Sequence, residues 1–593
     1  MIRKLFRPLL LPLGLCLQLQ AGTTFTPAVD PAANVRIEIQ SWLETCPQYG
    51  MVPLKVRIHN GGNKAQTWKV KVGNGNGGAG SMLLETKVTV EAGKEGSAKI
   101  YAPVTVPTDS GYYYGSAEVM VEGPAITNQH AGNIHSNSSG YRNNSTEFIG
   151  MGKKLSSKGW SALRDRVKEN KSSSSAELIG SELDMAGAPD DWRGYSGLAQ
   201  LWLDAGEWIT LDENVKGAIL DWVAMGGRLF VLNAGALGPD VRDVFPMLTG
   251  EVESIGKLRH GSGEVETFAW DGKTFPLQAV FQRVQKAGET SLGQKLDDYD
   301  GKWLLKDKVG ELTLRSGLIF GFIVIFGLLV GPLNLFWLAG AKRRHRLFWT
   351  TPALSLAGSA LLVALMILQD GTGGSGARMV LVTLLPEQKK LAVTQEQVAR
   401  TGVLIGGTFP VAEAGWMLPL DLDNEQRGGY NSSDRGRASF FDDGQNRWGD
   451  WFSSRSVQGH LLRSVRPSRA SVELFPDADP TAPPSVVSSV EVSLAKLFVV
   501  DDASRYWVAE DVGTGEKKVL RPATKNDYQA WLRSRVQDLA GPVIQHSINE
   551  MKARPGTIFA EAADPSRLAV PTLNAIRWND NVALIAGRYV KRS

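Results

Sequence analysis

The sequence predicts a multidomain chain in which β-rich and α/β parts flank a two-helix membrane hairpin. Two charge-free apolar runs stand past the middle of the chain, and each is long enough to cross a bilayer of about 30 Å as a helix. Before and after these runs, short stretches alternate apolar with polar residues, as half-buried strands do. Between residues 146 and 260 such stretches alternate with helical patterns, which indicates a parallel α/β sheet.

Composition excludes several classes of protein. The 593 residues suffice for about three or four domains. The 65 basic and 61 acidic residues nearly balance, so charge gives nucleic-acid binding no support. The cysteines are Cys16 and Cys46, and Cys16 lies in the N-terminal targeting segment. We therefore expect no intrachain disulfide and no cysteine-based metal site in the mature chain.

Residues 1–22 have the layout of a secretory signal peptide. Arg3, Lys4 and Arg7 form its basic end, an apolar stretch follows, and Ala21 offers a small-residue cleavage site. Cys16 follows Leu15 rather than a small residue, which argues against a lipoprotein anchor. We expect cleavage, with an uncleaved anchor as the alternative.

Residues 34–123 predict an immunoglobulin-like β-sandwich. Val35–Ile39, Leu54–Ile58, Trp68–Val72 and Val119–Val121 alternate apolar with polar residues, and turn residues such as Asn60 to Asn63 stand between them. About seven short strands in roughly 90 residues is typical of that fold. The stretch from Gln129 to Thr146 is rich in Asn, Ser and Gly and predicts a linker.

Residues 146–260 predict the α/β domain. Helical patterns cover Lys158–Asn170 and Asp212–Met225. The predicted strands are Glu147–Gly152, Ala176–Gly180, Leu198–Leu203 and Arg228–Asn233, with Gly263–Ala269 beyond the domain. Gly226 and Gly227 end the second helix, as glycine commonly does.

The run Tyr195 to Leu198, followed by Leu211 to Gly235, resembles the class I glutamine amidotransferase-like superfamily, which has a flavodoxin-like fold. The resemblance implies a tight elbow after the strand, with a Cys nucleophile that acts with a His and an acidic residue. By that pattern the elbow falls on Asn233, whose carboxamide cannot serve as a nucleophile. The domain contains no Cys at all. We expect a degenerate, non-catalytic domain with no catalytic residue.

The hairpin comprises residues 317–339, a loop 340–346 and residues 347–368. Lys342, Arg343, Arg344 and Arg346 in so short a loop place it in the cytoplasm, because basic residues accumulate on that side. Both long flanking regions then lie outside the cytoplasm, with the chain in a bacterial inner membrane. A buried hairpin of a soluble protein is the alternative.

Within the first span, Pro332 and Asn334 predict either a kink or a polar contact between the helices, unless they mark a frayed helix end. The order of signal, sandwich, amidotransferase-like domain and hairpin resembles that of uncharacterised bacterial membrane proteins. That likeness implies an architecture and no activity.

Residues 377–593 predict a β-rich extracytoplasmic domain with one helix over Asp527–Lys552, whose apolar stripe we expect to pack on a sheet. The predicted strands are Arg378–Leu385, Gly402–Ile405, Ser471–Leu474, Val490–Leu494, Leu497–Val500, Ile558–Glu561 and Val582–Ala586. Glu425–Ser456 predicts a long polar loop. It contains Asp442, Asp443, Asn446 and Asp450, whose spacing does not match an EF-hand, so we expect no metal site.

The sequence contains no zinc-protease, phosphate-loop or nucleophile-elbow motif. We therefore expect a non-catalytic, membrane-anchored binding or scaffold protein of the bacterial cell envelope, without a cofactor. Its partners would be the lipid bilayer and a protein of the membrane or envelope, not nucleic acid, and the sequence names no ligand. The alternatives are an envelope hydrolase or transferase with an unrecognised site, and an accessory subunit of a membrane transport complex.

Overall fold

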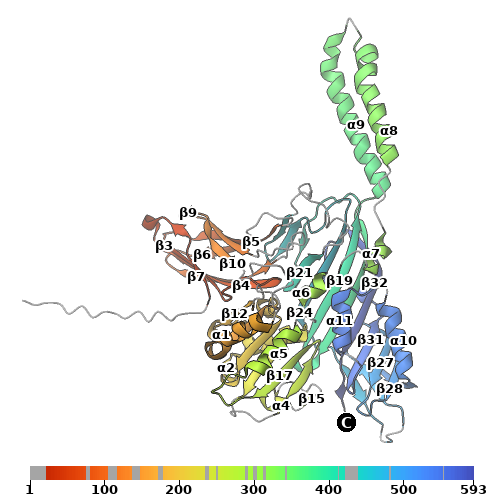
Figure 1. The fold of residues 1–593 in the computed structure, drawn as a ribbon. Coiled ribbons are helices and arrows are strands. Elements are labelled where there is room, and N and C mark those ends of the chain that lie inside the picture. The colour runs from red at the N-terminus through yellow and green to blue at the C-terminus, as the bar shows by residue number, and fades with distance from the viewer. Residues whose placement is uncertain are drawn as a thin grey trace, which may run out of the picture.

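The computed structural model describes residues 22–74, 81–104, 116–135, 147–170, 178–233, 240–246, 248, 252–254, 256–287, 292–297, 299, 303–310, 316–340, 343–411, 413–420, 439–477, 479, 482–537, 539–551 and 553–592. The expected signal peptide lies almost wholly outside these residues. The fold is mixed α/β and rich in strands, with a helical hairpin that projects from the body (Figure 1).

The N-terminal region is a sandwich of two packed sheets with an apolar core that includes Trp68, Ile37 and Val119. One sheet has the order β1 (Thr24–Phe25), β3 (Val35–Ser41), β4 (Gly50–Asn60) and β7 (Glu95–Val104). The other begins with β10 (His130–His135), β8 (Ser116–Glu122), β5 (Gln66–Asn74) and β6 (Ser81–Val90). A short ribbon pairs β2 (Ala28–Val29) with β9 (Ile126–Asn128). The linker prediction is wrong for His130–His135, because these residues pair with β8.

Three strands from the far end of the chain extend this second sheet. β22 (Ser439–Asp442) runs parallel to β6, and β23 (Asn446–Gly449) and β20 (Phe409–Pro410) follow it. The predicted polar loop is therefore wrong over residues 439–442 and 446–449, while residues 421–438 lie outside the described part. Local alternation is too short here to reveal a strand whose partner is more than 300 residues away.

The second region is built on a sheet with five parallel strands. They are β11 (Ile149–Gly152), β12 (Gly180–Leu183), β13 (Gln200–Asp204), β14 (Arg228–Asn233) and β17 (Gly263–Ala269). Their order across the sheet is β12-β11-β13-β14-β17. Counted along the chain this is 2-1-3-4-5, the order of a doubly wound sheet that reverses between β11 and β13. The antiparallel strands β16 (Lys257–His260) and β15 (Val252–Ser254) complete one edge.

Helices cover both faces of this sheet. α1 (Lys153–Asn170) and α5 (Leu277–Ala287) pack on one face. α2 (Ala205–Thr210), α3 (Glu213–Ala224) and α4 (Val241–Val244) pack on the other. The prediction for β14 is confirmed residue for residue, but the strand expected at Ala176–Gly180 lies further on, at β12. His260 is the buried last residue of β16.

The C-terminal region is one nine-stranded sheet with a smaller sheet on one face and helices on the other. Its order is β21 (Gly415–Leu420), β24 (Val457–Pro467), β19 (Lys390–Thr401), β18 (Gly374–Leu385), β32 (Ile576–Arg588), β31 (Thr557–Ala562), β27 (Leu494–Val500), β28 (Tyr506–Val512) and β30 (Arg521–Ala523). β29 (Lys517–Val519), β26 (Ser485–Ser488), β25 (Val472–Phe475) and β33 (Val590–Lys591) form the small sheet. α10 (Lys525–Val536) and α11 (Pro542–Met551) cover the opposite face.

Three C-terminal predictions are corrected. The single helix expected over Asp527–Lys552 is two helices, and Gly541 precedes the second. Gly402–Ile405 is not a strand, and Val490–Leu494 mostly precedes β27. The expectation that Tyr528 and Trp531 pack on a sheet is confirmed, because both lie in the core between α10 and the nine-stranded sheet.

Short helices α6 (Leu292–Asp297) and α7 (Leu304–Val309) lead to the hairpin. The first arm is α8 (Ser316–Leu328), continued by a π-helical stretch, Leu329–Leu338, and the second is α9 (Leu347–Asp370) after a short turn at Arg344–Arg346. The stretches Phe320–Leu338 and Arg344–Asp370 are long and apolar enough to cross a membrane. Asn334 Nδ2 donates to Thr351 Oγ1 at 3.0 Å, which gives the two arms a polar contact.

The hairpin is not a buried core element. At most 6% of either apolar window is buried, and Phe336, Trp337, Phe348 and Trp349 are 75–83% exposed. Its two open ends join the body, and its loop lies at the far tip (Figure 1). The base is fixed by a 2.7 Å ion pair between Arg455 Nε and Asp370 Oδ2. Both long regions of the chain therefore lie at the same end of the hairpin.

Candidate functional site

In a doubly wound sheet, ligands bind outside the carboxyl ends of the strands where the strand order reverses. Here that place lies between β11 and β13, and the chain's own carboxylate fills it. Glu207 Oε1 accepts the backbone N–H of Lys154, in the first turn of α1, at 3.1 Å, and Oε2 accepts that of Asp204 at 3.0 Å. A Cβ on Gly152 would clash with the Glu207 carboxylate, so any other residue there would displace that carboxylate from this position.

This arrangement removes the usual phosphate-binding position. The N-terminus of a helix attracts anions, but that of α1 already holds Glu207. Lys154 Nζ also donates to Asp204 Oδ1 at 2.5 Å, and burial raises the pKa of Glu207. A phosphate at this edge would meet two carboxylates.

Asn233 is the last residue of β14, at the same carboxyl edge. It is buried, and its carbonyl accepts the backbone N–H of Trp270 at 2.9 Å. Residues 234–239, which complete the expected elbow, lie outside the described part of the chain. The carboxamide at Asn233 supplies no nucleophile.

The residues expected to set the membrane orientation lie at the tip of the hairpin. Arg343, Arg344 and Arg346 are exposed in the turn that joins the two arms, and Figure 1 shows this turn at the end of the hairpin away from the body. Lys342 lies outside the described residues.

A crevice of about 630 Å³ separates the sandwich from the α/β region, within the usual size of a small-ligand pocket. Residues of β3, β4 and β7 line one side, and residues near the ends of β11 and β12 line the other. Its walls carry two aromatic rings and four cations, namely Trp42, Tyr101, Lys55, Arg57, Lys99 and Lys153. Lys55 and Lys99 are direct cross-strand partners, and Lys99 pairs with Asp190 at 2.5 Å. Asp184 is the acidic residue of the lining.

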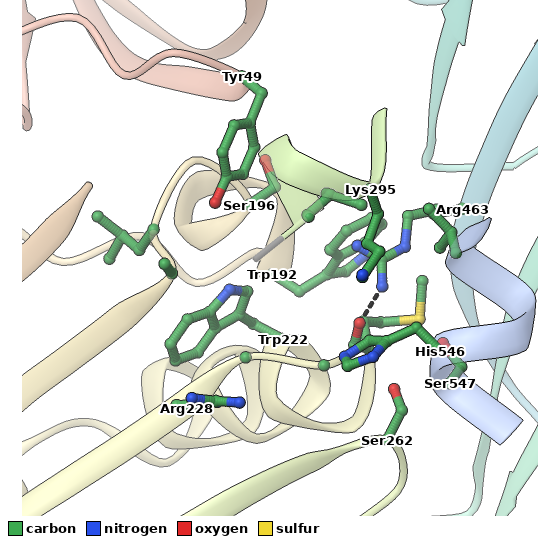
Figure 2. Close-up of a pocket in the computed structure, with 17 residues that line it drawn as sticks. Tyr49, Trp192, Ser196, Trp222, Arg228, Ser262, Lys295, Arg463, His546 and Ser547 are labelled. Atoms are coloured by element: carbon green, nitrogen blue, oxygen red, sulfur yellow. Dashed lines mark hydrogen bonds between the residues drawn. The ribbon is translucent and has the colours of Figure 1, made fainter. Parts of the chain in front are cut away.

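A smaller cavity of about 60 Å³ lies where four parts of the chain meet. Tyr49 comes from the sandwich, Trp222 to Arg228 from the end of α3 and the start of β14, and Lys295 from α6. Arg463 of β24 and His546 of α11 complete it. Figure 2 shows these side chains entering one space from separate elements. We call it the junction cavity.

Basic groups dominate the junction cavity. Arg463 is buried, and Nη2 donates to the backbone carbonyl of Met225, the hydrogen bond marked in Figure 2. Burial lowers the pKa of Arg463 to about 10. Burial also lowers the pKa of His546, as do the charges of Lys295 and Arg228, although Glu550 acts in the opposite sense. His546 is therefore neutral at pH 7.

No group of His, Cys, Asp and Glu in the described residues could hold a metal ion. Asp442, weighed as a calcium ligand, pairs with Arg447 at 2.8 Å, and Asp443 accepts backbone N–H groups of its own turn. The junction cavity was not predicted from the sequence. Arg463 and His546 stand in strand and helix patterns that give no sign of a shared space.

Comparisons with known proteins add no function. No family model and no curated protein matches the chain. Among solved structures, the chain is similar to a cycloisomaltooligosaccharide glucanotransferase from Paenibacillus sp. complexed with cycloisomaltoheptaose, at 10% identity and a TM-score of 0.16. That match covers 33% of this chain and 27% of the other, and so low a TM-score supports no conclusion.

Proposed function

We propose that this chain is a non-catalytic, membrane-anchored binding or scaffold protein of the bacterial cell envelope. The observation that carries the proposal is the filled carboxyl edge of the parallel sheet, where Glu207 occupies the anion position and β14 ends at Asn233. The sheet order supports a flavodoxin-like domain of the glutamine amidotransferase-like kind that has lost its reaction. The N-terminal sandwich serves as its immunoglobulin-like neighbour.

The hairpin supports the anchoring part of the proposal. Its exposed apolar surface requires lipid or other helices, and its basic tip favours the cytoplasmic face of the inner membrane. The large regions then lie outside the cytoplasm, where a secretory signal would deliver the first of them. Two apolar helices enclose no transport path by themselves, so the accessory-subunit alternative needs a channel-forming partner.

Cysteine labelling tests the topology. Asn128→Cys and Lys525→Cys each place a thiol on an exposed position of one large region, and His345→Cys places one at the hairpin tip. We expect a membrane-impermeant maleimide to label the first two in intact spheroplasts, and the third only after permeabilisation. The unmodified chain, whose Cys46 is buried, is the control. If only His345→Cys were labelled in intact spheroplasts, the topology would be the reverse of the proposed one.

Purification from detergent-solubilised membranes after mild crosslinking tests the scaffold role. We expect a stoichiometric membrane or envelope protein to copurify, and we expect the same protein when Asn233 is replaced by Ala. A chain that comes out alone contradicts the scaffold proposal. Loss of a measurable hydrolase or transferase activity in Asn233→Ala would contradict the non-catalytic one.

A further inference from the structure

We infer that the junction cavity binds an oxyanion, of the phosphate or sulfate class, that joins the sandwich, the α/β region, α6 and the C-terminal sheet. This inference goes beyond the proposed function, because it holds whether or not the chain is a scaffold. It rests on a buried cation, on the charge of the lining and on the size of the space.

Arg463 carries the inference. It projects from β24 into the cavity, and only 7% of the residue is exposed. Nη2 donates to the Met225 carbonyl, yet the buried Nε has no hydrogen-bond partner, and the described residues give the guanidinium no carboxylate within salt-bridge distance. A buried charge without a counter-charge is costly. An anion in the cavity would supply both the missing acceptor and the missing charge.

The lining has one sign of charge. Arg228 and Lys295 join Arg463 there, and none of the described lining residues is acidic. Glu264 forms ion pairs with Arg228 at 3.6 Å and with Lys257 at 2.8 Å, and it is not among the residues that line the cavity. Neutral His546 adds a ring nitrogen that can donate without adding charge. Arginine and lysine converging on one space is the usual recognition of phosphate oxygens.

The size fits a small anion. A volume of about 60 Å³ equals the share of about two waters in the liquid, which leaves room for one small anion. It is too small for a nucleotide or a sugar. Lys295 and His546 are only partly buried, which leaves a way in from solvent. The ligand is therefore a free anion or the phosphoryl end of a larger molecule that extends outward.

Calorimetric titration of the full chain in detergent with inorganic phosphate tests the inference, against sodium chloride of equal ionic strength. We expect saturable binding to the unmodified chain. Arg463→Met keeps the volume and removes the charge, so phosphate affinity falls roughly tenfold or more. Lys295→Met lowers it severalfold, while Lys525→Met, an equal loss of charge on exposed α10, leaves it unchanged.

Absence of saturable binding, or an affinity that Arg463→Met leaves unchanged, overturns the inference. If Arg463→Met fails to fold, Lys295→Met provides the test, because Lys295 is only half-buried on a short helix. An unchanged phosphate affinity of the Lys295→Met variant overturns the site equally. Glycerol 3-phosphate distinguishes the source of the anion. Tighter binding than inorganic phosphate indicates a phosphoryl end group, and equal or weaker binding indicates the free anion.

Discussion

Replacing Glu396 by Gln is expected to abolish a pH-dependent loosening of α11. Glu396 is fully buried on β19, where its carboxyl accepts the Tyr299 hydroxyl at 2.5 Å and the backbone N–H groups of Val543 and Ile544 at 3.1 and 2.9 Å. Gly541 N–H donates to its other oxygen. The carboxyl thus caps α11 from a distant strand and holds the segment that leads to the hairpin.

The pH window follows from the pKa of this carboxyl. Burial raises the pKa of Glu396 from 4.5 to about 7, against the opposing effect of its hydrogen bonds. Between these two values the folded state holds a proton that the unfolded state has released. Stability therefore falls as pH rises from 4.5 to about 7, by about 3 kcal/mol in all. The Gln variant has no such slope.

Hydrogen exchange of peptides covering α11 measures the effect at its source. Intrinsic exchange rates depend on pH but cancel between wild type and variant at one pH. We expect the protection of wild-type α11 relative to Glu396→Gln to decrease about a hundredfold from pH 4.5 to 7.5. Glu516→Gln, at an exposed turn, is the control and should show no trend. If the ratio of wild-type to Glu396→Gln protection stays constant with pH, ionisation of this carboxyl is not coupled to α11.

Replacing His460 by Gln is expected to remove a loss of stability that the wild-type chain shows as the pH falls. His460 is buried on β24, and Nε2 lies 2.7 Å from the carbonyl oxygen of Trp451, with the Phe452 ring at 4.8 Å. Burial lowers the pKa of His460 from 6.5 to about 4. Between these values the unfolded state binds a proton that the folded state lacks, so stability falls as pH drops, by about 3 kcal/mol.

Gln at position 460 can donate to the same carbonyl and does not titrate. We expect exchange protection of β24 peptides to drop steeply between pH 6.5 and 4.5 in wild type and much less in His460→Gln. His260, whose pKa burial likewise lowers to about 4, contributes its own loss, so the double variant should lose more of the pH dependence. His135→Gln, on an exposed position, is the control. Equal acid sensitivity of wild type and the double variant would contradict this assignment.

The features that the sequence predicted best are those encoded in local patterns. The two charge-free runs identify the hairpin because length and apolar composition alone decide whether a helix can cross lipid. The α/β alternation is equally local, and the strand Arg228–Asn233 agrees with its prediction because a Gly-Gly helix end precedes four consecutive apolar residues, Leu229 to Leu232. That the strand ends in Asn233, whose carboxamide is no nucleophile, also follows from the sequence alone.

Strand β19 shows what local patterns leave out. Its centre, Gln395 to Gln397, is polar and fully buried, so no apolar alternation marks it. The strand is stable there because Tyr299 and the first turn of α11, about 100 residues before and 150 after it, satisfy the Glu396 carboxyl. From sequence alone, a buried polar residue cannot be distinguished from a solvated one, because its hydrogen-bond partner is not known.

The hairpin, the order of β-rich and α/β regions and the Asn at position 233 can be predicted from the chain alone, because each depends on residues that are neighbours in the sequence. Three features needed the folded structure: Glu207 fills the carboxyl edge of the parallel sheet, β22 extends the N-terminal sandwich, and Arg463 meets Lys295 in one cavity. Those features depend on which distant groups face each other. Complementary charges and hydrogen-bond partners on distant segments produce no periodic pattern in the sequence of a single chain.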